Sequence, residues 1–171
     1  MADLGEDKGL SPPTHISDAH DLSGFDCGQP ELNDWLCHRA LKNESRFSRT
    51  YVVCNGNRVV AFVCISAGSV ERAAAPGRLR RNAPDTVPVS VIGRLAVDRT
   101  QAGMGLGADL LADALRRIAL ASRTIGIAAV LVHAKDEGSK AFYLRCAEFI
   151  EFPGDSGVLF LPVETVIAAM A

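Results

Sequence analysis

The stretch VSVIGRLAVDRTQAGMGLGADLL, residues 89–111, decides how this chain folds. Its first part, Val89–Val97, is largely apolar and predicts a central β-strand. A helical pattern follows, with Leu106, Leu110 and Leu111 on one face, and glycines alternate at positions 103, 105 and 107 where that helix begins. A strand that leads through a glycine-rich turn into a helix indicates a mixed α/β protein.

The glycine-rich turn has the chemistry of an anion site. Glycine adopts positive φ and lets the backbone approach a ligand, and the amides and dipole of a helix N-terminus favour a pyrophosphate. No Lys-Ser/Thr pair follows Gly107, so this is not a P-loop. The strand before it is internal, which argues against a dinucleotide site. A tight turn that needs glycine only for steric reasons is the alternative.

Further elements are expected on both sides of this stretch. Asn55-Gly56-Asn57 separates two β-rich runs and predicts a hairpin. Residues 1–15 read as a ragged polar start, and 72–88 as a loop with three prolines. The predicted helices are 30–43, 106–122 and 139–146, and the other predicted strands are 50–54, 59–66, 128–133 and 158–161.

Composition narrows the class of protein. With 171 residues and 48% hydrophobic content, the chain suits one domain, 1–171. The acidic, polar start lacks the features of a signal peptide, and the apolar stretches are shorter than a membrane span. Five cysteines without a CxxC pair and four scattered histidines argue against disulfides and a metal site, so a reducing cytoplasm is expected.

The net charge of −2 hides an asymmetry. Residues 1–38 carry a net charge of −7, residues 39–94 carry +7, and residues 95–171 carry −2. A basic middle third in a near-neutral chain suggests a local anionic partner. A solvated surface of scattered charges is the equally open alternative.

Dispersed motifs occur in order from about residue 20 to 145. They are Gly24-Phe-Asp-Cys-Gly28 with Leu32 and Trp35-Leu36, Arg39-Ala-Leu-Lys-Asn43, Ser48-Arg-Thr-Tyr-Val52, Arg80-Arg-Asn82 with Pro84 and Pro88, Gly93-Arg-Leu-Ala-Val-Asp98, Gly105-Leu-Gly107, Val132-His-Ala134 and Phe142-Tyr143. This set resembles the GCN5-related N-acetyltransferase (GNAT) superfamily, and within it the acetyltransferase toxins of bacterial type II toxin–antitoxin systems. The resemblance implies an α/β (α+β) GNAT fold, a mixed sheet splayed at a β-bulge with helices on both faces.

The resemblance also implies acetyl-CoA as co-substrate. The residues expected to bind it are Leu95, Ala96, Val97, Ala102, Gly103, Met104, Gly105, Leu106, Gly107, Ala108, Ser139 and Phe142. The family usually has Gln or Arg where Ala102 stands, and Gln101 is one residue early; backbone amides do most of the binding, so CoA should still bind. The family's Tyr-x-x-x-Gly-Phe is here a longer Tyr143–Phe149 segment without the glycine.

Acetyl transfer needs a polarised carbonyl and a protonated leaving thiolate. By resemblance, an amide exposed by a bulge at residues 95–97 would polarise the carbonyl, and Tyr143 would be the general acid. A tyrosine packed in a helix is the structural alternative. The acceptor is expected to be an amine that is neutral at cellular pH, so no dedicated base is needed; Glu44 and His133 read as structural or surface residues. Cys146 is expected on a buried helix face, which argues against an acyl-cysteine.

The toxin branch acetylates the amino acid carried on tRNA, which implies aminoacyl-tRNA as substrate and a block of translation. The expected phosphate contacts are Lys42, Arg46, Arg49, Arg78, Arg80, Arg81 and Arg94. The resemblance also implies a ribbon-helix-helix antitoxin as partner and a homodimer. It implies no membrane association, and contact with DNA only through the antitoxin complex. The other hypotheses are a GNAT enzyme for a small amine or a protein N-terminus, and a silent acyl-CoA-binding module.

Overall fold

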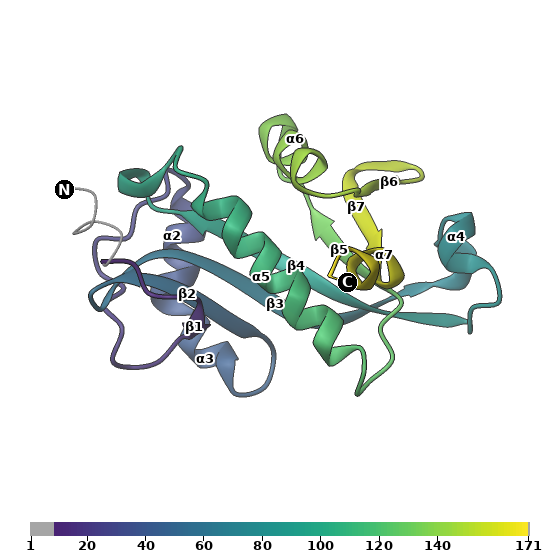
Figure 1. Cartoon of the computed structure of the whole chain (residues 1–171), viewed down its shortest axis with the longest axis horizontal. Coiled ribbons are helices and arrows are strands. Elements are labelled where there is room, and N and C mark those ends of the chain that lie inside the picture. The colour runs from purple at the N-terminus through teal and green to yellow at the C-terminus, as the bar shows by residue number, and fades with distance from the viewer. Residues whose placement is uncertain (1–8, 171) are drawn as a thin grey trace. The chain divides into compact units, whose positions relative to one another are not determined.

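The computed structural model describes residues 9–170 (Figure 1). The chain divides into two compact units. Unit 1 holds the described residues up to Ile65 together with Arg94–Asp113, and unit 2 holds Ser66–Gly93 together with the chain from Ala114 onward. Strands β3 (Arg58–Glu71) and β4 (Thr86–Val97) and helix α5 (Leu106–Ala121) run from one unit into the other. The expectation of a single domain therefore stays a prediction.

The strands of unit 1 confirm the predicted hairpin. Strand β2 (Arg49–Asn55) pairs antiparallel with β3, and the short β1 (Thr14–His15), which the sequence did not reveal, pairs with β2. Gly56 has φ +68° in the turn between β2 and β3, a conformation that glycine adopts without steric cost. A register shift interrupts β2 between Val53 and Cys54, whereas the bulge expected at residues 95–97 stays a prediction.

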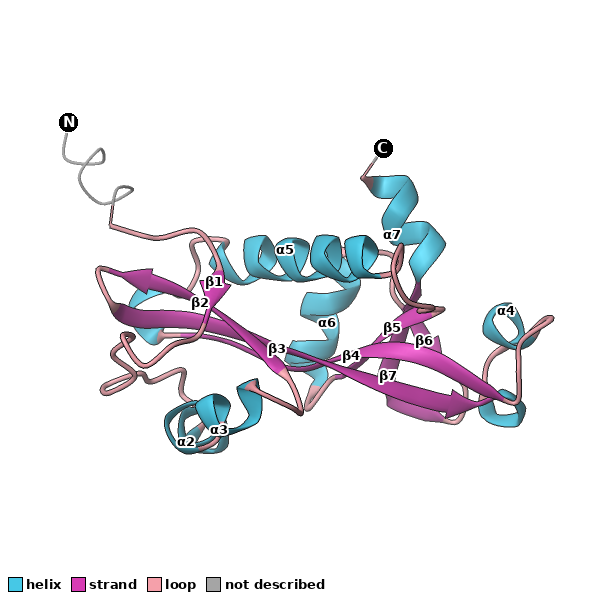
Figure 2. Cartoon of the chain, turned by 90° about the horizontal axis from the view of Figure 1, so that it is seen from below, coloured by secondary structure: helices cyan, strands magenta, loops and turns pink. Residues whose placement is uncertain are grey.

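The predicted single helix over 30–43 is wrong in its continuity. The segment forms α2 (Pro30–His38) and α3 (Ala40–Glu44), which are separated at Arg39, with φ −123°. Ala40, directly after the break, lies in the same core as Trp35 and Leu36, while Arg39 stays exposed. Figure 2 shows α2 and α3 on one side of β2 and β3 and the start of α5 on the other.

Aromatic side chains hold the core of unit 1 together. Trp35 stacks on Phe62 with ring centroids 5.9 Å apart, and Phe25 meets Phe62 edge-on at 5.5 Å. Such pairs contribute about 0.5–1.5 kcal/mol beyond their buried area. Because Phe62 lies on β3 and Trp35 on α2, this cluster attaches the helix to the sheet.

In unit 2, β4 is parallel to β5 (Ala129–His133), with register from Val89↔Ala129 to Ile92↔Val132. Strand β7 (Asp155–Pro162) is antiparallel to β5 and to β6 (Ile150–Phe152). Helices α6 (Glu137–Cys146) and α7 (Val163–Ala169) complete the unit. Strand β6 and helix α7 were not predicted, and the strand expected at 158–161 is longer.

The expected loop over 72–88 contains structure of its own. A 3₁₀ turn, η1 (Arg72–Ala74), and a one-turn helix, α4 (Gly77–Arg80), precede β4. Pro76 is the N-cap residue of α4, so a proline read as a loop signal starts a helix. Leu79 and Ala75 are buried against β5 and β7 residues, which explains why this short turn is ordered.

The strand order is β1-β2-β3-β4-β5-β7-β6. The order combines antiparallel pairs with one parallel pair, β4–β5, as expected of a mixed α/β fold. Within residues 9–170, no helix is both long and apolar enough to cross a membrane.

Candidate functional site

The glycine-rich turn of unit 1 presents backbone to solvent. Gly103 and Gly105 have φ of +80° and +81°, and a Cβ built on either would meet nothing within 4 Å. The glycines are therefore required by conformation and not by close packing. The Gly105 carbonyl accepts from the Asp109 amide at 3.1 Å, and α5 begins at Leu106 with Gly107 in its first turn. The turn thus leaves amides of a helix N-terminus open to an anion.

Exposure differs along the segment around the turn. Ala102, Gly103, Met104, Gly105 and Ala108 are exposed, whereas Leu106 and Gly107 are half-buried. In the preceding strand, Ala96 is buried and Leu95 and Val97 are half-buried. All ten residues lie in unit 1, in one continuous segment of expected CoA-binding residues.

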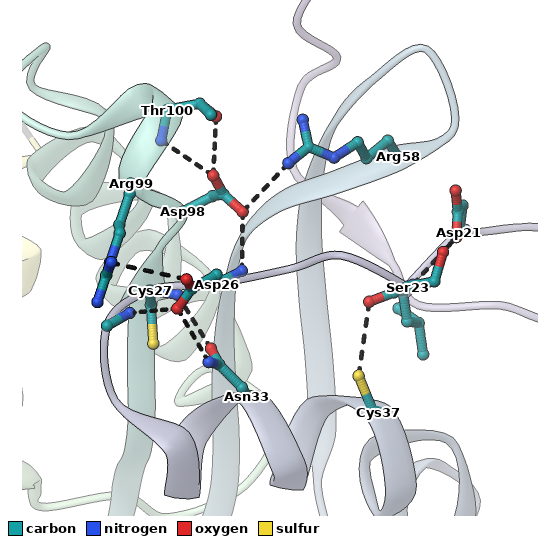
Figure 3. Close-up of polar contacts among 12 residues, drawn as sticks. Asp21, Ser23, Asp26, Cys27, Asn33, Cys37, Arg58, Asp98, Arg99 and Thr100 are labelled. Carbon is teal, nitrogen blue, oxygen red and sulfur yellow. Dashed lines mark hydrogen bonds and ion pairs between the residues drawn. The ribbon is translucent and has the colours of Figure 1, made fainter.

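A polar cluster anchors the base of this turn (Figure 3). The Asp98 carboxylate, 2% exposed, accepts from the Thr100 amide and hydroxyl at 2.9 and 2.8 Å and from the Asp26 amide at 2.9 Å. The Arg58 guanidinium lies 3.4 Å from the same carboxylate. The Arg99 amide in turn donates to the Asp26 carbonyl at 2.9 Å. We call Asp26, Arg58, Asp98, Arg99 and Thr100 the loop clasp, because they tie the chain just before the glycines to residues far away in sequence.

The Asp26 side chain extends the clasp to helix α2. Its carboxylate accepts from the Gly28 amide at 2.9 Å and from the Asn33 side chain at 3.2 Å, and the Arg99 Nε lies 3.8 Å away. A Cβ at Gly28 would lie 3.3 Å from the Arg99 guanidinium, and Gly28 has φ +89°. Glycine at this position therefore leaves room for Arg99 beside Asp26.

Both clasp carboxylates are held ionised. Burial itself favours the neutral form of Asp98, but donation from the Asp26 and Thr100 amides, the Thr100 hydroxyl and the Arg58 charge lower the pKa of Asp98 below its usual value. Donation from the Gly28 amide, and then from Asn33, lowers the pKa of Asp26. Each hydrogen bond goes to the charged form and so stabilises it.

In unit 2, helix α6 presents the expected catalytic tyrosine. Asp136 is the N-cap of α6, and its carboxylate accepts from the Ser139 amide at 2.7 Å. Tyr143 is 6% exposed and meets Phe142 and Phe149 edge-on, at 5.3 and 5.7 Å. The longer segment after Tyr143 therefore still returns Phe149 to the tyrosine ring.

Burial sets the acidity of Tyr143. Desolvation raises the pKa of Tyr143 to about 12, and the nearby Cys146 acts in the same direction. The hydroxyl therefore keeps its proton throughout the physiological range, as a proton donor must.

The other candidate groups for chemistry have different environments. Cys146 is exposed, so the expectation that it fills a buried helix face is wrong; α6 ends at this residue. Desolvation raises the pKa of the Cys146 thiol, which reduces its thiolate fraction and its reactivity. Glu44 is half-buried and accepts from the Thr50 amide at 2.7 Å, and His133 is exposed at the end of β5.

The expected phosphate-binding residues fall into two groups. Lys42, Arg46 and Arg49 are exposed in unit 1, and Arg94, in the same unit, is half-buried with its guanidinium 4.3 Å from the centre of the Trp35 ring. Unit 2 holds the second group, the exposed residues Arg78, Arg80 and Arg81 in and just after α4. A continuous basic track over both groups stays a prediction.

Sequence reasoning missed the loop clasp and the Asp136 cap. Asp98-Arg-Thr100 and Asp136-Glu-Gly-Ser139 carry local capping signals, because an Asp side chain commonly accepts from amides two or three residues ahead. The Asp26–Asp98 contact spans 72 residues, and nothing local indicates it. Within the described residues, no group of three or more His, Cys, Asp and Glu side chains could hold a metal ion.

Comparison with known proteins places this geometry in a family. The model of the acetyltransferase (GNAT) family matches residues 15–149. The chain belongs to this family. The GNAT match covers β2 to β5, helix α6 and the glycine-rich turn, so the parallel pair β4–β5 and the turn lie within the part of the chain that defines the family.

The GNAT relatives include toxins. A tRNA-acetylating toxin of Mycobacterium tuberculosis is 50% identical over 138 residues, which cover 80% of this chain and 83% of that protein. The structure of AtaT complexed with acetyl-methionyl-tRNAfMet has 29% identity, a TM-score of 0.86, and coverage of 95% and 99%. A tyrosine-to-phenylalanine mutant of the toxin AtaT, bound to acetyl-CoA and the C-terminus of the antitoxin AtaR, has 28% identity, a TM-score of 0.83, and coverage of 95% and 99%.

Proposed function

We propose that this GNAT protein is a toxin that transfers acetyl from acetyl-CoA to the α-amino group of an aminoacyl-tRNA and thereby blocks translation. The observation that carries the proposal is its 50% identity to a tRNA-acetylating toxin over most of both chains. The similarity to AtaT, a structure of which contains acetyl-methionyl-tRNA, supports the same substrate class.

We assign binding of the CoA pyrophosphate to the glycine-rich turn. The open amides after Gly103 and Gly105 and the dipole of α5 favour negative charge there. The turn keeps this property although Ala102 replaces the usual Gln or Arg, because the interaction depends on the backbone. We also propose that Ser139 and Phe142 contact CoA, as the family resemblance implies.

We assign proton transfer to Tyr143. The neutral α-amine attacks the thioester carbonyl, an N–C bond forms, and the C–S bond breaks as the tetrahedral intermediate collapses. Tyr143 gives its hydroxyl proton to the departing CoA sulfur and recovers one from the ammonium nitrogen, so the products are the amide and neutral CoA thiol. The pKa of about 12 keeps Tyr143 protonated until the thiolate leaves, and the proton from the ammonium nitrogen then restores the tyrosine hydroxyl.

The acceptor amine needs no strong base. An α-amino group has a pKa of about 7.7–8.0, and the ester linkage to tRNA lowers it further, so a large fraction is neutral at cellular pH. Glu44 and His133 can therefore keep structural roles. The proposal places the reaction in the cytoplasm, where both substrates occur.

Partners complete the proposal. AtaT binds the C-terminus of its antitoxin AtaR, and we propose that an antitoxin of ribbon-helix-helix type neutralises this chain in a similar way, with DNA contacted only through the antitoxin complex. We also propose a homodimer, in which the basic groups of two chains would form one RNA-binding surface.

Cell-free translation tests the proposal. The purified protein should arrest synthesis only when acetyl-CoA is present, and mass spectrometry of the recovered tRNA should show an acetylated aminoacyl group. Tyr143→Phe retains the ring and its contacts but has no proton to donate, so it should slow acetylation about 10²–10⁴-fold while binding acetyl-CoA normally. Undisturbed translation by a protein that binds acetyl-CoA would contradict the toxin function and favour a small-amine or protein N-terminal substrate.

A further inference from the structure

Phe47 is an exposed aromatic ring near the end of a basic segment, residues 39–49. The ten Phe, Tyr and Trp residues all lie in the part of the chain that the structure describes, and of these Phe47 alone is exposed, at 63%. The Arg46 guanidinium lies 5.1 Å from the centre of its ring. An exposed apolar side chain is common by itself, so the argument depends on what surrounds it.

The turn that carries Phe47 is fixed by hydrogen bonds. The Asn43 carbonyl accepts from the amides of Arg46, Phe47 and Ser48, at 3.2, 2.9 and 3.2 Å. The Arg49 guanidinium donates to the carbonyls of Glu44 and Ser48. The backbone under the ring is therefore held from both sides, and the exposure of the ring does not come from a loose segment.

The surface around the ring is positive. Residues 39–49 contain four basic residues and one acid, Glu44. The Glu44 carboxylate is directed to the Thr50 amide, and it also lies 3.7 Å from His15 and 3.8 Å from Arg49, with its side chain only 19% exposed. The only negative charge of the segment is thus turned inward, whereas Lys42 and Arg46 are exposed and the Arg46 guanidinium lies by the ring.

We infer that Phe47 and Arg46 form a stacking platform for an unpaired base of the RNA substrate. This inference rests on the proposed function and names a contact within it. Every nucleobase has a flat face that stacks on an aromatic ring or on a guanidinium, and basic neighbours hold the adjoining phosphates. An acidic peptide would instead need a concave apolar pocket for its side chains, whereas Phe47 offers one exposed face.

The platform suits the single-stranded end of the tRNA acceptor stem. Acceptor stems end in a single strand whose bases are free to stack, and phosphate contacts alone would position a duplex without engaging those bases. Tyr51, the next aromatic residue along the chain, is half-buried with its ring centroid 4.5 Å from that of His15. Phe47 is therefore the residue assigned to the single-stranded end.

Two RNA probes and three variants test the inference. The probes are an acceptor-stem minihelix with its single-stranded 3′ end and the same minihelix cut to a blunt end. Phe47→Leu keeps an apolar side chain without the flat face, Phe47→Trp keeps the face, and Lys42→Gln removes a neighbouring charge. Each variant is also tested for an unchanged melting temperature, which is expected because Phe47 and Lys42 are exposed.

Phe47→Leu should weaken binding of the tailed minihelix by roughly 5- to 150-fold at every salt concentration, the range for loss of one stacked base. The slope of affinity against salt should not change, because no phosphate contact is lost. Phe47→Trp should bind like the unmodified protein, and the blunt minihelix should bind the two Phe47 variants and the unmodified protein equally. Lys42→Gln should instead reduce the salt slope by about 0.7.

Equal affinity of Phe47→Leu and the unmodified protein for the tailed minihelix would overturn the inference. So would a loss that depends on Phe47 for an acidic, leucine-containing peptide but not for RNA, which would assign the ring to a protein partner. Failure of the unmodified protein to bind any minihelix would instead refute the proposed tRNA function.

Discussion

Replacing Asp98 by Asn tests whether the loop clasp supports the glycine-rich turn. The carboxylate accepts three hydrogen bonds from Asp26 and Thr100 at 2.8–2.9 Å and pairs with Arg58 at 3.4 Å. An amide keeps one acceptor oxygen and turns an NH₂ group toward the donors that the other oxygen served. A buried donor left without an acceptor costs about 1–3 kcal/mol, so we expect a loss of about 2 kcal/mol, or about 4–8 °C in melting temperature for a chain of this size.

The assay is thermal unfolding together with steady-state kinetics. Because the clasp holds the chain just before the turn, the KM for acetyl-CoA should rise several-fold while kcat changes less. Asp21→Asn is the matched control, since the exposed Asp21 also accepts from a neighbouring amide and hydroxyl, those of Ser23, at 3.0 and 2.6 Å. It should change neither stability nor KM.

The pH dependence of the same variant gives a second check. The pKa of Asp98 is lowered in the fold, so its contribution to stability is present above its unfolded value of about 3.9 and is lost as the pH falls through the lower folded value. The gap between Asp98→Asn and the unmodified protein should close in acid. A gap no larger than that of Asp21→Asn at pH 7 would refute the clasp.

Three further predictions concern the other parts of the proposed site. Gly105→Ala forces a residue with a Cβ into φ +81°, which costs about 1–2 kcal/mol, so acetyl-CoA affinity measured by calorimetry should fall about 5- to 30-fold, whereas Gly126→Ala should leave it unchanged. The pH–rate profile of acetylation should show no alkaline decline from Tyr143 up to pH 10, because its pKa of about 12 keeps it protonated, and a decline that begins near pH 9 and disappears in Tyr143→Phe would contradict this. Arg80→Gln should reduce the slope of tRNA affinity against salt by about 0.9, and an unchanged slope would remove this residue from the RNA-binding set.

Sequence reasoning succeeded where one segment carries the whole signal. The hairpin around Gly56 and the helix from Leu106 follow from local turn chemistry and from periodicity, and both are confirmed. The break at Arg39 has no local signal such as Gly or Pro, and the apolar spacing runs unchanged from Leu36 to the buried Ala40 across it. Strands of two or three residues, such as β1 and β6, are too short to show a period.

Parts of the candidate site could likewise be predicted from local sequence, and parts could not. The glycine-rich turn could be predicted because conformation and anion chemistry share a few adjacent residues. The clasp could not be, since Asp26 and Asp98 meet only through the tertiary fold. The exposure of individual aromatic side chains could not be predicted either. Phe47 lies in solvent, whereas Trp35 and Phe62 are buried, and this difference is set by the tertiary fold.

The 72-residue separation of Asp26 and Asp98 also sets an order of assembly. A hairpin such as β2–β3 closes a short loop and can form early, whereas contacts between distant residues must first meet a larger entropic cost of chain closure. The turn that is proposed to hold the cofactor is therefore expected among the last parts of unit 1 to become native. A nascent chain would then have to extend beyond residue 98 before its anion-binding amides are fixed, so acetyl-CoA binding should arise only after that point of synthesis.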